Sequence, residues 1–194
     1  LTPALLLRTL RLNCLTRSYA KLWEDLFGRF SLAGEQWAVS WDGLAPLAGS
    51  IAAEWDEATP LRNERERRAA LVELDALVAV WLGIGVEELI AIYRGRYPIL
   101  ADREAELWFD ADGHRIAADP YAFGFRQRKE HYRQLMDHLD PEIEGPVPEG
   151  YRSPFYKADR EAEYRRAHAV FTERLRQAGW PTTNDAWVGK EGGA

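Results

Sequence analysis

The sequence has only one cysteine, Cys14, in 194 residues. A single thiol cannot form an internal disulfide or a cysteine-based zinc site, and its isolation is typical of a protein from the reducing cytosol. No apolar run approaches the roughly 20 residues that a membrane-spanning helix needs, and residues 5–7 are too short for the core of a signal peptide. These absences predict a cytoplasmic protein that has no membrane partner.

Short motifs that would indicate a cofactor or a catalytic group are also missing. Gly83-Ile84-Gly85 follows a helical pattern rather than a strand, and acidic residues come next, so we interpret it as a helix C-cap and a tight turn rather than a phosphate-binding loop. Asp119-Pro120-Tyr121 resembles half of the (Asp/Asn)-Pro-Pro-(Tyr/Phe) motif of amino-methylating enzymes but lacks its second proline. We therefore interpret it as a loop turn.

No set of metal ligands stands out. Residues 110–113 begin like a calcium loop, but the twelfth position, which needs a bidentate Glu, is Tyr121, so Asp112-Gly113 is better explained as a hairpin turn. His131 and His138 are seven residues apart on one predicted helix, whereas zinc-binding helices use a four-residue spacing. We expect surface or core-edge roles for the histidines and assign no metal site.

Hydrophobic and aromatic residues are plentiful: 46 % of the chain is hydrophobic, with 8 Trp, 8 Tyr and 7 Phe. This composition suffices for a folded core. The net charge of −6 is unevenly distributed, at +3 over residues 1–30, −8 over residues 31–110 and −1 over residues 111–194. Because an acidic middle repels phosphate, any nucleic-acid contact is expected from the first helix or the C-terminal third.

Hydrophobic periodicity predicts a mainly α fold, an irregular helical domain with one small β-hairpin and a flexible C-terminal tail. We expect a single helical domain over residues 1–178 and a tail over residues 179–194. The predicted elements are an N-terminal helix at 1–28, a central helix pair at 59–95, the hairpin at about 107–117, and helices at 128–139 and 154–178.

Local signals set these bounds. Apolar residues recur three or four apart from Leu5 to Leu26, which favours one continuous helix. Thr59-Pro60 is a favourable helix entry, because the hydroxyl can cap the helix and proline suits its first turn. The buried stripe of that helix is expected to include Val78 and Trp81. Residues 30–58 have no clean period and predict a structured loop, either irregular throughout or with a short helix near residues 47–56.

The best pattern for nucleic-acid binding lies around residue 130. Phe123, Phe125 and Tyr132 are interspersed with basic residues, whose guanidinium and ammonium groups bind phosphate while the rings stack on bases or sugars. The candidate nucleic-acid-binding residues are Arg115, Arg126, Arg128, Lys129 and Arg133.

A second basic strip lies on the last predicted helix, where it is interleaved with acidic residues. It consists of Lys157, Arg160, Arg165 and Arg166. For both basic groups the alternative interpretation is a solvated charged surface without a ligand.

Four stretches of the chain resemble the C-terminal region of large bacterial adenine-specific DNA methyltransferases of restriction-modification and phage-defence systems, of the type II fusion, BREX-like and DISARM-like kinds. They cover about half of the chain. The stretches are LRLNCLTRSYAKLW (10–23), TPLRNERERRAALVELDALVAVWLGIGVEELIAIYRGRYPIL (59–100), WFDADGHRIA (108–117) and PVPEGYRSPFYKADREAEYRRAHAVF (146–171).

In that family S-adenosylmethionine binds a Rossmann-like domain, and a target-recognition region reads DNA. This chain has neither the cofactor glycine loop nor the double-proline motif, so no catalytic or cofactor-binding residue is carried over. The resemblance implies a non-catalytic helical module that braces the parent methyltransferase and contacts double-stranded DNA, with S-adenosylmethionine bound by the parent enzyme. Since the chain begins with Leu rather than Met, we expect a piece of a longer protein or a trimmed form.

Two other functions are compatible with the sequence. The chain could be a protein–protein adaptor that recruits another subunit of a defence system through its acidic middle and exposed Trp residues. It could also be an independent hydrolase with an unrecognised site, although no local Ser/His/Asp motif favours this.

Overall fold

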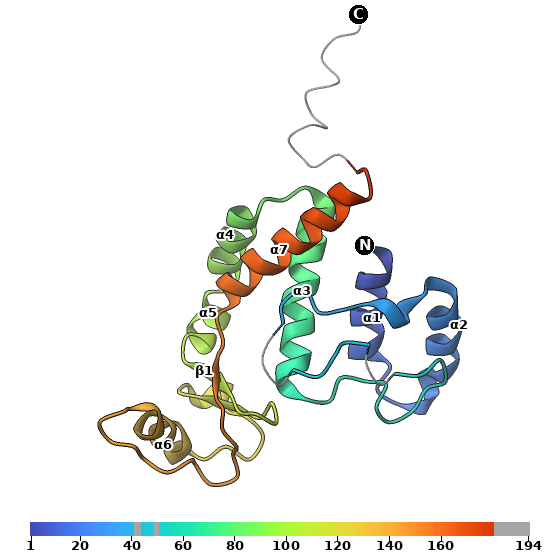
Figure 1. Cartoon of the computed structure of the whole chain (residues 1–194). Helices are drawn as coiled ribbons and strands as arrows, with labels where there is room; N and C mark the ends of the chain where they lie inside the picture. The colour runs from blue at the N-terminus through green and yellow to red at the C-terminus, as the bar shows by residue number, and fades with distance from the viewer. Residues whose placement is uncertain (41–43, 49–50, 181–194) are drawn as a thin grey trace, which may run out of the picture. The chain divides into compact units, whose positions relative to one another are not determined.

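The computed structural model describes residues 1–40, 44–48 and 51–180 (Figure 1). Most of these residues are helical, and one small sheet accompanies the helices, which confirms the predicted fold class. The α-helices are α1 (Thr2–Asn13), α2 (Ala20–Phe30), α3 (Glu64–Leu82), α4 (Val86–Arg96), α5 (Pro98–Glu104), α6 (Lys129–Leu139) and α7 (Arg160–Gln177). The strands are β1 (Leu107–Phe109), β2 (Arg115–Ala117) and β3 (Tyr156–Lys157).

The chain divides into two compact units, where the sequence predicted one domain over residues 1–178. The first unit comprises Leu1–Leu61, Ala69–Ala91 and Glu161–Ala194, and the second comprises Arg62–Arg68 and Ile92–Arg160. The predicted tail lies, from residue 181 onward, outside the described residues. None of the helices in the described part is long and apolar enough to cross a membrane.

The predicted single helix over residues 1–28 is wrong, because the structure has two helices there. The carbonyl of Arg11 accepts a hydrogen bond from the Leu61 amide at 2.8 Å, and the carbonyl of Cys14 accepts one from the Trp55 indole at 2.8 Å. These distant donors replace helical partners, so the chain turns at Cys14 although the apolar spacing continues. Cys14 itself is buried, and burial raises the pKa of its thiol.

The segment from residue 35 to residue 61 is irregular at its described positions, which include no helix near residues 47–56. Buried donors hold this segment in place. The Arg11 guanidinium donates to the carbonyls of Leu47, Ala58 and Thr59 at 2.5 to 3.1 Å. Arg8 is fully buried and bonded to the equally buried Glu73 on α3, with 2.7 Å between Nε and Oε2. Backbone groups of an irregular segment need such partners when water is excluded.

Helix α3 begins at Glu64 rather than near Thr59. The Asn63 side chain accepts hydrogen bonds from the amides of Arg65 and Glu66, at 2.9 and 3.2 Å, and so caps the helix. The hydroxyl of Thr59 is occupied locally, since it accepts from the Asp56 amide at 2.9 Å. The predicted burial of Val78 and Trp81 is also wrong, because these side chains are 40 % and 60 % exposed.

The Gly83-Ile84-Gly85 turn has the predicted helix-capping geometry. Gly83 has a φ of +74°, and the Ile84 amide donates to the Ala79 carbonyl at 2.8 Å, as in a Schellman cap. The Gly85 amide donates to the Glu88 carboxylate at 2.8 Å, which caps α4. The Gly85 amide, which a phosphate-binding loop would offer to its ligand, is therefore already bonded to the Glu88 carboxylate.

The second unit contains the predicted hairpin and one strand that the sequence did not reveal. In the antiparallel order β2-β1-β3, Trp108 pairs with Ile116 on one side and with Lys157 on the other. Because residues 156–157 extend along β1, α7 begins at Arg160 and not at the predicted residue 154. Helix α5 was also not predicted; Pro98 ends α4 but suits the first turn of a new helix.

Candidate nucleic-acid interface

The loop between β2 and α6, residues 118–128, is fixed to the sheet by its own side chains. The Gln127 amide donates to the Ala117 carbonyl at 2.7 Å and accepts from the amides of Ala117 and Gly124 at 3.0 Å each. Gly124 lies so close to β2 that a Cβ atom on it would stand 2.0 Å from the Arg115 carbonyl oxygen. The loop therefore has a defined shape that presents its outward side chains in fixed positions.

Two aromatic rings of this loop point into solvent, each with a guanidinium over it. Tyr121 is 83 % exposed and lies 5.2 Å from the Arg103 Cζ, and Phe125 is 77 % exposed and lies 5.0 Å from the Arg126 Cζ. These distances are typical of cation–π contacts. Arg126 has a φ of +65°, which is uncommon for a residue with a side chain.

Helix α6 adds exposed cations next to this loop. Lys129 and Arg133 are four residues apart and so lie on one face of the helix, opposite the buried side chains of His131 and Leu135. Among the described residues, neither they nor Arg126 have a carboxylate within ion-pair distance. We call Tyr121, Phe125, Arg126, Lys129 and Arg133 the basic-aromatic surface.

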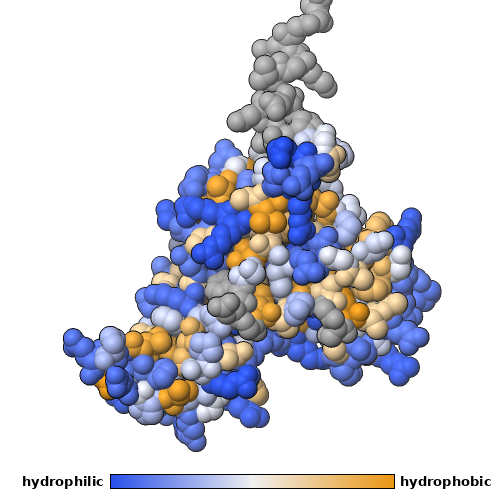
Figure 2. All heavy atoms as spheres, in the orientation of Figure 1, coloured by the Kyte–Doolittle hydropathy of each residue, from blue (hydrophilic) through white to orange (hydrophobic). Residues whose placement is uncertain are grey.

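Figure 2 shows that around α6 hydrophobic and hydrophilic residues are mixed rather than gathered into one apolar patch. A surface of this kind suits a charged ligand with flat apolar parts better than it suits a lipid or a large apolar partner face.

Two of the five predicted residues have other contacts. Arg128 is the N-cap residue of α6, and its guanidinium pairs with Glu149 at 2.6 Å and with Glu130 at 3.3 Å. Arg115 is half-buried, and its Nη2 lies 3.2 Å from the Glu64 carboxylate and donates to the Phe123 carbonyl at 3.1 Å. Arg115 ties β2 to the loop and Arg128 ties the start of α6 to Glu149, while Arg126, Lys129 and Arg133 are exposed.

Two tyrosines and a histidine of the second unit have pKa values shifted by burial. Burial, together with the charges of Asp110 and Glu64, raises the pKa of Tyr151 to about 12, and its ring packs edge-on against His131 at 5.3 Å. Burial and a hydrogen bond to Glu106 raise the pKa of Tyr132 to about 12. Burial and the adjacent Arg128 lower the pKa of His131. His131 is therefore neutral and structural at pH 7.

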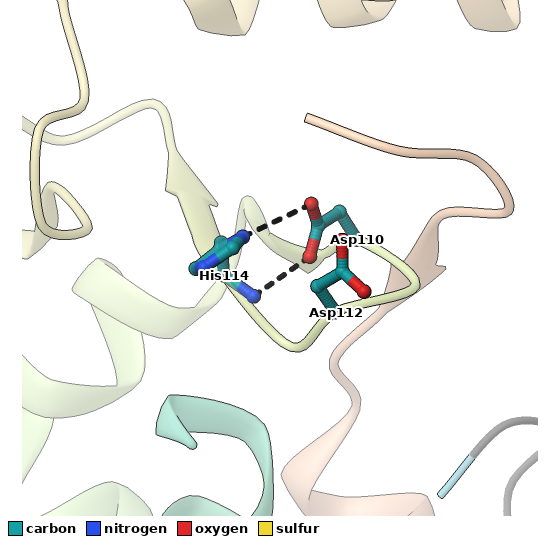
Figure 3. A group of neighbouring side chains, drawn as sticks. All are labelled: Asp110, Asp112 and His114. Carbon is teal, nitrogen blue, oxygen red and sulfur yellow. Dashed lines mark hydrogen bonds and ion pairs between the residues drawn. The ribbon is translucent and has the colours of Figure 1, made fainter. Parts of the chain in front are cut away.

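The hairpin turn brings Asp110, Asp112 and His114 together, with ligand atoms within 4.8 Å of one another (Figure 3). The buried Asp110 carboxylate, however, accepts from the backbone amides of His114 at 2.7 Å and of Arg152 at 3.1 Å. The Asp112 carboxylate pairs with the Arg152 guanidinium. Both carboxylates are engaged in shaping the turn, which agrees with the interpretation of this motif as a hairpin turn.

The remaining histidines and the Asp119 motif also have structural contacts. His138 Nδ1 is 2.8 Å from the Gly145 carbonyl, and His168 Nε2 is 2.9 Å from the Ile84 carbonyl. The Asp119 carboxylate accepts from the Tyr121 amide at 2.8 Å and caps the short 3-10 helix η3 (Pro120–Ala122), as a loop turn does.

The second predicted basic strip is largely neutralised. Lys157 pairs with Glu106 at 3.2 Å and Arg160 with Glu104 at 2.7 Å in the second unit. In the first unit Arg165 pairs with Glu87 at 2.9 Å, and Arg166 is exposed. These ion pairs make the strip a weaker candidate for phosphate contact than the basic-aromatic surface.

Neither Tyr121 as part of this surface nor Arg103 as the cation over its ring was identified from the sequence. Tyr121 was considered there only within the Asp119 motif and the rejected calcium loop. Arg103 is 18 residues earlier, so only the fold brings it over the ring. The available signal was an aromatic directly after Asp-Pro in a turn, where side chains point outward.

Comparison of the chain with protein-family models, with curated proteins and with solved structures found no match.

Proposed function

We propose that this chain is a non-catalytic helical module of an adenine-specific DNA methyltransferase in bacterial restriction or anti-phage defence. In the cytoplasm it braces the parent enzyme and contacts double-stranded DNA, while the parent enzyme binds S-adenosylmethionine. The parentage rests on the four sequence stretches that resemble this family. The DNA contact rests on one structural observation: Arg126, Lys129 and Arg133 are exposed cations without carboxylate partners in the described residues, beside a fixed loop.

The distribution of charge supports this placement of the DNA contact. The second unit holds 15 basic and 15 acidic residues, so the net charge of −6 belongs to the first unit. A neutral unit with locally unpaired cations can approach phosphate without the repulsion that the first unit would add. Arg115 and Arg128 support the interface indirectly, by fixing the loop and the start of α6.

The test is duplex binding as a function of salt, with a variant in which Arg126, Lys129 and Arg133 are all changed to Gln. We expect weaker binding at low salt and a shallower plot of log Kd against log salt, by about 0.9 for each phosphate that the variant no longer neutralises. The three side chains are exposed, so the fold should be kept.

The matched control removes the same charge elsewhere. Arg17, Lys21 and Arg96 are exposed and lie outside the basic-aromatic surface. A variant with Gln at these three positions should keep the salt slope of the unmodified chain. If the two variants lose binding equally, only net charge matters and the assigned surface is wrong.

The adaptor function has one structural observation in its favour. Helix α3 carries an exposed apolar stripe of Leu71, Val78, Trp81 and Leu82, with Leu82 70 % exposed. Spacings of three, four and seven residues place these side chains on one helix face, as in helices that dock against a partner. Absence of duplex binding at low salt would favour this function over DNA contact.

A further inference from the structure

Tyr121 and Phe125 are exposed on a loop whose backbone position is fixed. The Asp119 cap, the three Gln127 hydrogen bonds and the close approach of Gly124 to β2 determine the path of the loop on both sides of these rings. Single exposed apolar side chains are common on protein surfaces. Tyr121 and Phe125 differ because they are the two most exposed large hydrophobic side chains of the described residues, at 83 % and 77 %, and share one fixed loop beside cations.

The backbone at Arg126 supports the same conclusion. A left-handed φ of +65° is unfavourable for arginine and persists only where the surroundings determine it. In this conformation the guanidinium lies over the Phe125 ring, which remains 77 % exposed. Phosphate-binding charge and a flat stacking surface are thus held side by side at Phe125, whereas the Arg103 guanidinium over the Tyr121 ring also lies 3.9 Å from the Asp119 carboxylate.

The combination of ring and guanidinium matches the chemistry of an unpaired nucleotide. A base in a duplex has both faces covered by its neighbours, so an exposed ring on the protein cannot stack on it, and a duplex would use only the cations. An unpaired base offers a free face, and stacking of bases on aromatic side chains is largely independent of sequence. The adjacent phosphates would meet Arg126, Lys129 and Arg133.

We propose that the basic-aromatic surface binds single-stranded nucleic acid, with unpaired bases stacked on Phe125 and Tyr121. This proposal deepens the proposed function and rests on it for the phosphate contacts, because both use the same three cations. It adds a class of ligand that duplex contact does not require, which is a single strand of DNA or RNA. Single-stranded DNA and RNA both offer bases for stacking and phosphates for the cations.

The test compares three labelled probes by fluorescence anisotropy at low salt: single-stranded DNA of about 15 nucleotides without self-pairing, RNA of the same sequence, and the corresponding blunt duplex. Phe125→Leu and Tyr121→Leu keep apolar bulk but remove the ring. We expect each to raise the Kd for single strands by about fivefold or more, and to change the Kd for the duplex less than twofold. Phe125→Trp should retain or strengthen single-strand binding.

Tyr97→Leu is the matched control, because Tyr97 is an exposed tyrosine of the same unit outside this loop. It should leave all three Kd values unchanged. The single-stranded probe with the lower Kd shows whether the surface prefers DNA or RNA.

The outcomes separate this proposal from the proposed function. If the Arg126, Lys129 and Arg133 variant loses duplex binding while Phe125→Leu and Tyr121→Leu have no effect on single strands, the stacking proposal is wrong and the duplex contact stands. If the ring variants weaken duplex and single strand equally, stacking is also excluded. If no probe binds, both proposals fail.

Discussion

Glu104, a largely buried carboxylate of the second unit, is shared by two arginines. In the second unit the Glu104 carboxylate accepts two hydrogen bonds from Arg160, at 2.8 and 2.7 Å, and one from Arg68 at 3.1 Å. All three side chains are about nine-tenths buried. Burial alone would raise the pKa of Glu104, but the hydrogen bonds and charges of the two arginines outweigh it and lower that pKa.

Glu104→Gln should be strongly destabilising, because it removes the negative charge that two largely buried guanidinium groups share. Breaking a buried ion pair from one side typically costs about 3–5 kcal/mol. Urea denaturation of the variant measures this as a drop in the free energy of unfolding. Glu142→Gln, at an exposed position, is the control and should differ little from the unmodified chain. Equal stability of the two variants would contradict this role of Glu104.

The same substitution has a defined pH signature. Because the folded-state pKa of Glu104 lies below the ordinary value of 4.5, its stabilising effect is complete above that value and is lost as the pH falls through the folded-state pKa. The Glu104→Gln variant lacks this contribution, so the difference in stability between variant and unmodified chain should shrink as the solution is acidified below about pH 4.5.

Elements whose signals are local could be predicted, and elements that depend on distant partners could not. Asp112-Gly113 specified the hairpin and Gly83 the end of α3, because each turn needs a particular residue at one position. The break after α1 could not be predicted, because it depends on Leu61 donating to the Arg11 carbonyl in α1 and Trp55 to the Cys14 carbonyl just after it. Strand β3 depends in the same way on β1, more than 45 residues earlier.

In the candidate interface, too, locally determined features could be predicted and those that depend on distant partners could not. The exposure of Lys129 and Arg133 followed from helical spacing on α6, since buried and exposed faces alternate predictably. The engagement of Arg115 and Arg128 did not, because their carboxylate partners, Glu64 and Glu149, are 51 and 21 residues away. Single-sequence patterns identify charges but not which of them are neutralised by the fold.

The loop that carries Tyr121 and Phe125 should tolerate no side chain at Gly124. A methyl group there would meet the Arg115 carbonyl oxygen at 2.0 Å, so the loop must move away from β2 and lose its Gln127 hydrogen bonds. We expect Gly124→Ala to lower the free energy of unfolding by about 1–3 kcal/mol and to weaken single-strand binding.

Gly95→Ala is the matched control for this substitution. Gly95 lies in α4 with no atom within 4 Å of an added Cβ, and alanine favours helix. This variant should be equally or more stable than the unmodified chain, by up to about 1 kcal/mol, and should bind with unchanged affinity. Urea denaturation and anisotropy measure both effects; an unaffected Gly124→Ala variant would show that the loop position is not fixed by β2.

At the scale of the whole molecule, charge and apolar surface are assigned to different units. The first unit has the net charge of −6 and the exposed α3 stripe, whereas the neutral second unit has the basic-aromatic surface. An acidic unit with an apolar helix face suits contact with protein, and it would repel a polyanion. Bracing and nucleic-acid contact are thus compatible functions of one chain, because each can be assigned to its own unit.

This division makes a prediction about catalysis. The proposed roles of the chain are binding and bracing, and the sequence lacks both the glycine loop that holds S-adenosylmethionine and the double-proline motif that positions a target amino group. The isolated chain, incubated with labelled S-adenosylmethionine and duplex DNA, should therefore incorporate no label above the level of a reaction without protein. A known adenine methyltransferase serves as the positive control. Incorporation that persists after removal of contaminating enzymes would place the catalytic site in this chain and overturn its proposed role as an accessory module.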